Sequence, residues 1–194
     1  MHPTRREILE FKIANINDLS HDTSILPTQK VENAMKQFGR WSESEVITPN
    51  NIASDMIALI PEESVGNNFC FLDIASKEGE FANAIFKRFG DRVKNNIFSL
   101  PTSGVAYEFT RKVYEELGLP VENIISEFNT YEKKKKNKEK YLDIIKTMKI
   151  NAIVGNPPYQ INNGSGGTND APVYQDFSLI GLDYSSDYSC MIMK

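Results

Sequence analysis

The most informative segment of the sequence is Ala152-Ile153-Val154-Gly155-Asn156-Pro157-Pro158-Tyr159-Gln160. Its apolar start is typical of a short buried strand, which we expect over residues 150–154. Each proline fixes its own φ angle, lacks an N–H donor and restricts the preceding residue to extended geometry. The loop after the strand is therefore stiff, and it carries backbone carbonyls, the Asn156 amide and the Tyr159 ring. These groups suit a planar molecule that bears an amino group.

The composition is that of a soluble globular protein with one sizeable domain. The chain has 194 residues, 40% of them hydrophobic and 25% charged, which is enough for one core and a small appendage. No apolar run approaches the roughly 20 residues that span a bilayer, and the N-terminus does not resemble a secretory signal. The net charge of −4 argues against a generic nucleic-acid binder, which is expected to have a basic face. We expect a cytoplasmic protein without a membrane partner.

Neither the cysteines nor the histidines form a pattern typical of a metal site. Cys70 and Cys190 lie in predicted strands, outside any cluster of ligand-like residues, and we interpret them as buried thiols. His2 and His21 have no cysteine or histidine partner at metal-ligand spacing. We therefore expect no metal site.

Predicted strands alternate with predicted helices along the chain. The strands are expected over 69–74, 96–100, 123–126, 150–154 and 188–193, and the helices over 5–19, 28–39, 49–60, 81–89, 104–117, 141–148 and 172–182. This alternation predicts a mostly parallel sheet with helices on both faces. Residues 1–45 form a predicted N-terminal helical segment and residues 46–194 the α/β core. Because the sequence stops on an apolar strand, we expect a fragment whose sheet is incomplete.

A second informative segment, residues 73–81, is the predicted turn between a buried strand and a helix. Turns at the carboxyl ends of strands hold ligands in open α/β sheets, and Gly79 would let the backbone approach a ligand closely. The segment lacks the Gly-Lys-Ser/Thr ending of a phosphate-binding loop, so that function is excluded. Upstream, Thr28 and Thr48 are predicted helix N-caps. The loops at 73–81 and 155–160 follow strands of one sheet and would face one crevice.

The loop at Asn156 could make an aromatic amine reactive. The lone pair of such an amine is delocalised into its ring, so the amine is a poor nucleophile. The Asn156 side-chain carbonyl and the Pro157 backbone carbonyl can accept its hydrogens and favour tetrahedral geometry, in a loop that proline fixes in advance. Tyr159 can stack on the ring, which contributes roughly 1–3 kcal/mol per base. If the methyl group comes from a sulfonium, which is already electrophilic, the transfer needs alignment of the amine with the methyl group and no strong base.

Asn156-Pro157-Pro158-Tyr159 resembles the catalytic motif of S-adenosylmethionine-dependent amino methyltransferases, especially the DNA adenine-N6 enzymes of restriction-modification systems, including fused restriction-methylation enzymes. Residues 72–81 resemble their cofactor motif, in which Asp is followed by Ala-Cys-Gly-x-Gly-x-Phe. Thr48-Pro49 and residues 172–177 are similar to elements that flank the two motifs. The resemblance covers about residues 41 to 194, and it implies a Rossmann-like class I methyltransferase fold.

The resemblance also implies the reaction, which is methyl transfer from S-adenosylmethionine to the N6 amine of an adenine flipped out of double-stranded DNA. Asn156, Pro157, Pro158 and Tyr159 would form the catalytic loop. The cofactor site would be formed by Thr48, Pro49, Asp73, Ala75, Ser76, Gly79, Phe81, Glu127, Asn129 and Asn156. Of these, Glu127 or Asn129 would replace the Asp that usually ends the third strand. Recognition of the DNA sequence would need a segment outside this chain, and the motifs do not give the oligomeric state.

Some positions depart from the family pattern. Ser76 and Lys77 stand where the family has Cys and its first Gly, and a lysine there would either crowd the cofactor or point to solvent. The end of the second predicted strand, residues 99–102, has no acid to bind the cofactor's ribose hydroxyls, and Glu108 is already in the next helix.

Two other functions stay open from the sequence alone. Protein glutamine methyltransferases use a similar Asn-Pro-Pro-Tyr loop, because a carboxamide is also a planar, delocalised amine. The Thr48-Pro49 element and the glycine-rich residues 162–170 favour DNA instead. The second alternative is an inactive or incomplete methyltransferase-like domain with a structural role, which the altered turn at Ser76-Lys77 supports.

Overall fold

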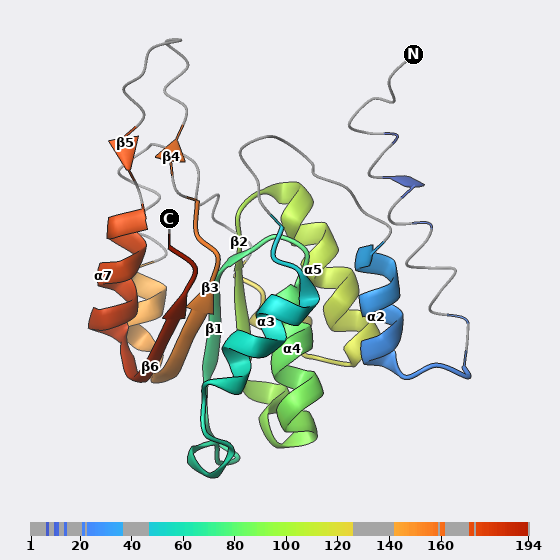
Figure 1. Cartoon of the computed structure of the whole chain (residues 1–194), viewed down its shortest axis with the longest axis horizontal. Helices are drawn as coiled ribbons and strands as arrows, with labels where there is room; N and C mark the ends of the chain where they lie inside the picture. Colours follow the sequence, from blue (N-terminus) through green and yellow to red (C-terminus); the bar gives the residue numbers. More distant parts are fainter. Residues whose placement is uncertain are drawn as a thin grey trace.

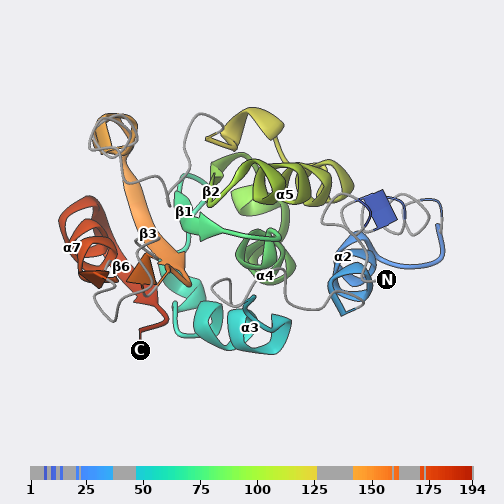
Figure 2. The same ribbon diagram turned by 90° about the horizontal axis from the view of Figure 1, so that it is seen from above.

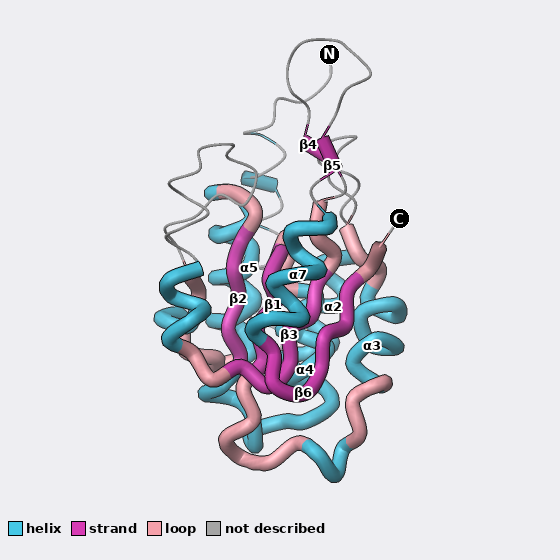
Figure 3. The backbone as a smooth tube through the Cα atoms, turned by 90° about the vertical axis from the view of Figure 1, so that its left-hand side faces the viewer, coloured by secondary structure: helices cyan, strands magenta, loops and turns pink. Residues whose placement is uncertain are grey.

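A four-stranded parallel sheet forms the centre of the protein, as the alternation of elements predicts. The computed structural model describes residues 23–36, 47–125, 142–158 and 174–193, with short pieces at 7, 10–11, 14, 21, 160–161 and 171–172. The strand order is β2-β1-β3-β6 (Figure 3), with β1 at Phe71–Ser76, β2 at Ile97–Pro101, β3 at Ile150–Gly155 and β6 at Ser185–Met191. Two short strands, β4 (Gln160–Ile161) and β5 (Ala171–Pro172), pair antiparallel outside this sheet.

Helices cover both faces of the sheet (Figures 1 and 2). The described helices are α2 (Pro27–Lys36), α3 (Asn50–Ala58), α4 (Glu80–Phe89), α5 (Gly104–Leu117), a helical segment at 142–147 and α7 (Tyr174–Tyr184). Short 3₁₀ turns lie at Glu62–Ser64, Gly90–Asn96 and Val121–Asn123. Among the described helices, none is long and apolar enough to cross a membrane.

Alternate side chains of each strand pack into two separate hydrophobic cores. Phe71 and Val154 contribute to the core that α2, α3, α4 and α5 cover. Leu72 and Ile153 contribute to the opposite core, which contains Ile145 from the segment at 142–147 together with residues of α7. Burial on both faces is typical of a parallel sheet, and each large apolar side chain buried in this way contributes about 1.5–3 kcal/mol.

The chain reverses its direction of winding between β1 and β3. From β1 it passes through α4 to β2 on one side, whereas β3 pairs with the other side of β1. The crevice beyond the carboxyl ends of strands at such a switch point is the usual ligand site of this fold. Gly155 lets the two strand ends lie close, since a Cβ there would stand 3.2 Å from Ile74 Cγ2 and 3.5 Å from Asp73 Oδ1.

The predicted third strand over 123–126 is wrong in the part that the structure describes. Ile124 makes only an isolated bridge with Ser99, and residues 121–123 form a 3₁₀ turn. The Asn123 side chain donates to the carbonyls of Asn95 and Ile97. Because the turn and these side-chain bonds hold the segment, little of it is left to extend the sheet.

Both predicted N-caps are also wrong. Helix α2 begins at Pro27, so Thr28 lies inside its first turn rather than before it. Proline suits the first helical position because the N–H of that residue has no partner within the helix. Helix α3 begins after Pro49 without a side-chain cap, and the Thr48 hydroxyl bonds elsewhere. The helix predicted over 172–182 begins two residues later than expected, because Pro172 lies in β5 and α7 starts at Tyr174. Most of the helix expected over 5–19, and the glycine-rich loop at 162–170, lie outside the described residues.

Candidate active site

The Asn156-Pro157-Pro158 segment is buried at the carboxyl end of β3. The Asn156 side-chain Nδ2 donates to the Thr48 hydroxyl at 3.2 Å, and both residues are almost fully buried. An amide that directs its nitrogen toward Thr48 directs its carbonyl oxygen the opposite way, so Thr48 sets the orientation of Asn156. Tyr159, the predicted stacking residue, lies outside the described residues.

The turn after β1 is fixed by hydrogen bonds to neighbouring elements. The Ala75 backbone N–H donates to Asp73 Oδ1 at 3.3 Å. The Ser76 hydroxyl shares a 2.9 Å hydrogen bond with the Thr110 hydroxyl of α5, and the Ser76 carbonyl accepts from the Thr102 N–H at 3.0 Å. The serine that replaces the family's cysteine therefore ties the turn to α5.

Gly79 and Phe81 pack against the elements behind the turn. Gly79 has a φ of +76°, a left-handed conformation that favours glycine, and a Cβ there would lie 3.1 Å from the Val113 side chain of α5. The structure thus gives Gly79 a role in the turn and in the packing of α4 on α5. Phe81 is fully buried in the core formed with α2, α3, α4 and α5.

Lys77 crosses from the turn to the Asn156-Pro157-Pro158 segment. Its side chain is buried, with 6% exposure, and its Nζ donates to the backbone carbonyl of Asn156 at 2.9 Å. Of the two orientations that the sequence left open for this lysine, the one that points to solvent is wrong. The contact connects the two halves of the predicted site directly.

Burial dominates the electrostatics of the turn. Asp73 is inaccessible to solvent, which raises the pKa of its carboxyl well above the ordinary value, and the nearby carboxylate of Glu80 raises it further. Hydrogen bonds from Ser76 and Ala75 and the charge of Lys77 oppose that shift only partly. Glu80 is also buried, and its Oε2 accepts the backbone N–H of Glu78 at 3.0 Å.

Several buried acceptor oxygens near the turn have no hydrogen-bond partner among the described residues. They include Asp73 Oδ2, Glu80 Oε1 and Thr102 Oγ1. Leaving such an atom unsatisfied costs about 1–3 kcal/mol, so each of these atoms needs a partner, which a water molecule or a ligand can supply. Thr102 directly follows β2, where the sequence has no acid. Thr102 is not among the predicted site residues, because a single threonine is not part of a recognisable motif.

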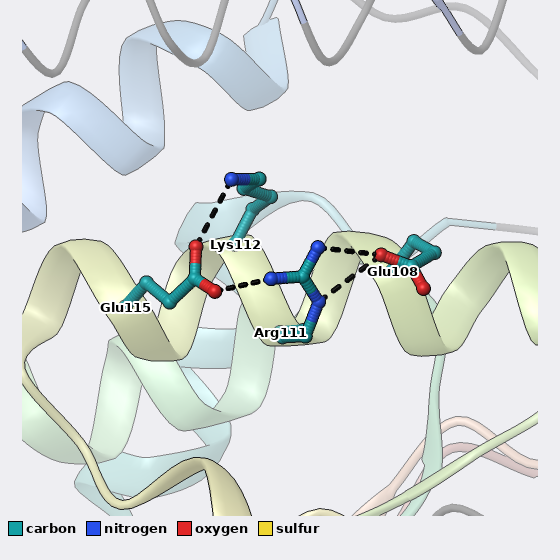
Figure 4. A network of polar contacts seen from close by, with 4 residues as sticks. All are labelled: Glu108, Arg111, Lys112 and Glu115. Carbon is teal, nitrogen blue, oxygen red and sulfur yellow. Dashed lines mark hydrogen bonds and ion pairs between the residues drawn. The ribbon is translucent and has the colours of Figure 1, made fainter.

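Glu108 does not replace the missing acid. Its carboxylate pairs with Arg111 at 2.8 Å on the surface of α5, within a network that Glu115 and Lys112 extend along the helix (Figure 4). Of the remaining predicted site residues, Pro49 is exposed where the chain enters α3, and Glu127 and Asn129 lie outside the described residues. Within the part of the chain that the structure describes, no group of three or more ligating side chains could hold a metal ion.

Solved structures contain a similar fold. The structure matches the crystal structure of a type I restriction-modification system methyltransferase subunit from Streptococcus thermophilus with a TM-score of 0.59 and 18% sequence identity. The match covers 82% of this chain and 36% of that subunit. The predicted Rossmann-like methyltransferase fold is thereby confirmed.

Sequence comparison gives the family. An uncharacterized adenine-specific methylase from Mycoplasma pneumoniae is 41% identical over 63 residues, which cover 29% of this chain and 15% of that protein. The chain thus spans a small part of the curated relative that it matches. The sequence model of the Eco57I restriction-modification methylases matches residues 95–194, which are 100 of the 194 residues. The chain therefore belongs to the Eco57I restriction-modification methylase family.

Proposed function

We propose that the full-length protein transfers a methyl group from S-adenosylmethionine to the N6 amine of adenine in double-stranded DNA. The observation that carries this proposal is the meeting of two turns at the switch point of the sheet. Lys77 of the β1–α4 turn and the backbone carbonyl of Asn156 are hydrogen-bonded there, 2.9 Å apart. The family and the adenine-specific relative support DNA adenine as the substrate.

The acceptor oxygens of the turn fit the cofactor. Asp73, Glu80 and Thr102 would hold it, because each has an unpartnered oxygen that can accept a hydrogen bond from the ammonium or hydroxyl groups of S-adenosylmethionine. The Thr102 hydroxyl and a protonated Asp73 carboxyl can also donate. When bound, the cofactor supplies a methyl group on a positively charged sulfur, which is electrophilic without further activation. The chain itself then has to align the amine and keep water away.

Asn156 and Pro157 would hold the adenine amine. The Asn156 side-chain oxygen and the Pro157 carbonyl accept its two hydrogens, which restores lone-pair density on the nitrogen. Thr48 keeps the Asn156 amide turned in the required sense, so the acceptors are oriented before the base arrives. Tyr159 would stack on the flipped base.

The test uses the full-length protein, tritiated S-adenosylmethionine and duplex DNA. Asn156→Ala is expected to lower methyl transfer by about 100-fold or more, as the loss of a preorganised polar group does, while the affinity for S-adenosylmethionine stays within about twofold of wild type. Asn51→Ala, an exposed position of α3, is the matched control and should retain full activity. An Asn156→Ala protein with near-wild-type turnover would refute the assigned role.

Two further results would overturn the proposal as a whole. Label that enters a release-factor glutamine peptide but not duplex DNA would identify a protein methyltransferase. If calorimetry detected no binding of S-adenosylmethionine in the millimolar range, the domain would be a structural one that performs no methyl transfer.

A further inference from the structure

The lysine at position 77 places a buried positive charge inside the candidate cofactor site. Lys77 belongs to the turn after β1, and its ammonium reaches the carbonyl of Asn156 on the catalytic loop at 2.9 Å. Its side chain is 6% exposed, so solvent screens this charge poorly. A molecule that contacts both the turn and Asn156 must therefore lie close to this ammonium.

The reaction changes the charge of the molecule that the site holds. S-adenosylmethionine carries a sulfonium cation, whereas its product, the thioether S-adenosylhomocysteine, is neutral at sulfur. The sulfur has to lie near Asn156, because the methyl group it carries is delivered to the amine that Asn156 holds. The Lys77 charge thus opposes binding of the sulfonium and has little effect on the thioether.

We propose that Lys77 is a specificity-determining residue that lowers the affinity for S-adenosylmethionine relative to S-adenosylhomocysteine by charge repulsion. This inference rests on the proposed function, since it assumes that these two molecules occupy the site. The product would therefore compete more strongly with S-adenosylmethionine than it would if the side chain at position 77 were neutral.

The acidic residues of the same turn also affect the affinity for the sulfonium. Asp73, Glu78 and Glu80 are all buried beside Lys77, and any negative charge that they carry attracts a sulfonium. Removing the Lys77 charge also favours protonation of Asp73, because that charge lowers the pKa of the Asp73 carboxyl. The change in the ratio of the two affinities therefore reports the Lys77 charge together with the response of these acids.

Calorimetric titration of the full-length protein with both molecules tests the inference. Lys77→Met keeps most of the length of the side chain and removes its charge, and it is expected to shift the affinity ratio at least about tenfold in favour of S-adenosylmethionine, because two unit charges a few ångströms apart interact strongly at a buried site. An analogue with a protonated amine in place of the sulfonium should gain affinity in Lys77→Met by about the same factor as S-adenosylmethionine. Lys77→Arg keeps the charge and should keep the wild-type ratio, as should Lys149→Met at an exposed position.

Each outcome of this experiment decides a different statement. Equal changes of both affinities in Lys77→Met would overturn the charge inference and show that the side chain acts by filling space. A Lys77→Met protein in which neither affinity changed would overturn it as well. Lys77→Gln, which is neutral but polar, provides the same measurement if the methionine variant does not fold. Failure of the wild-type protein to bind either molecule would instead refute the proposed function.

Discussion

Asp73 is the residue whose ionisation should make the fold sensitive to pH. Burial and the neighbouring Glu80 raise the pKa of its carboxyl in the folded protein, whereas the unfolded chain has an ordinary value of about 3.9. The folded state therefore binds the proton more tightly. The resulting stability is fully present below the ordinary pKa and is lost as the pH rises through the raised value.

Asp73→Asn should remove this dependence. We expect hydrogen-exchange protection of the β1 amides in the wild-type full-length protein to fall as the pH rises above the ordinary pKa of about 3.9, after correction for intrinsic rates, and to fall less in the variant. The exposed Asp91→Asn is the matched control and should keep the wild-type response. A steeper loss of protection in Asp73→Asn than in wild type would contradict this assignment.

Single residues also mark where sequence reading reaches its limit. The pattern at 155–158 predicts Asn156 and Pro157 as site residues, because prolines restrict the backbone locally. The partner of Asn156 could not be found in this way, since Thr48 lies 108 positions upstream and a Thr-Pro pair reads equally well as a helix cap. The orientation of Lys77 was likewise undecided, because only the packed structure shows the Asn156 carbonyl within its reach.

The packing of α4 on α5 depends on one position, Gly79. A Cβ at Gly79 would lie 3.1 Å from both Cβ and Cγ1 of Val113, and Cβ is fixed to the α5 backbone. Gly79→Ala should thus cost about 1–2 kcal/mol for the left-handed backbone and about 1–3 kcal/mol for overpacking. Hydrogen exchange of α4 and α5 in the full-length protein would measure both.

A double-mutant cycle separates the two costs. Val113→Ala in the Gly79→Ala background removes the Cγ contacts but keeps the Cβ contact. It should recover part of the overpacking cost, so the destabilisations should fall short of additivity by about 1 kcal/mol. Gly118→Ala is the matched control, because φ and ψ there are 65° and 30°, close to those of Gly79, and a new Cβ would meet only the end of the flexible Lys94 side chain. It should show the backbone cost alone. Additive losses for Gly79→Ala and Val113→Ala would mean that α5 adjusts freely.

Elements bounded by local signals were predicted best. Helix α5 has the expected bounds because the Ser103 side chain caps its start by accepting from the Ala106 N–H, and Gly118 ends it with a φ of +65°. The third strand failed because pairing with β2 depends on distant residues, and the turn at 121–123 competes with it. Local chemistry thus predicts where helices begin and end, whereas the extent of strand pairing depends on the assembled sheet.

Across the whole molecule, the N-terminal segment shares a core with the methyltransferase fold. Val31 of α2 is buried in the same cluster as residues of α4 and α5. Two ion pairs add to this contact, Lys30 Nζ to Glu116 Oε1 at 3.2 Å and Lys87 Nζ to Glu32 Oε1 at 2.5 Å. The division of the chain at residues 45 and 46 stays a prediction about domains, but α2 packs on the core rather than apart from it.

The Lys30–Glu116 pair should decide whether α2 stays docked. Both side chains are largely buried, at 9% and 13% exposure, so Lys30→Met leaves a poorly solvated carboxylate and should cost about 3–5 kcal/mol of docking. Lys30→Met combined with Glu116→Leu should recover most of this loss, because an apolar pair needs no desolvation of charge. Hydrogen exchange of residues 27–36 in the full-length protein would report undocking directly.

The exposed pair of Lys112 and Glu115 on α5 is the matched comparison. Its side chains are 23% and 40% exposed, and a pair of this kind contributes about 0–1 kcal/mol, so Lys112→Met should leave α2 protected. If Lys30→Met alone also left residues 27–36 protected, apolar contacts such as that of Val31 would be sufficient to hold α2. If the double variant were as unprotected as the single one, the ion pair would supply orientation that apolar side chains cannot replace. We expect instead that Lys30→Met loses protection at residues 27–36 and that the double variant regains it. Both results follow if the loss comes from the unpaired charge of Glu116.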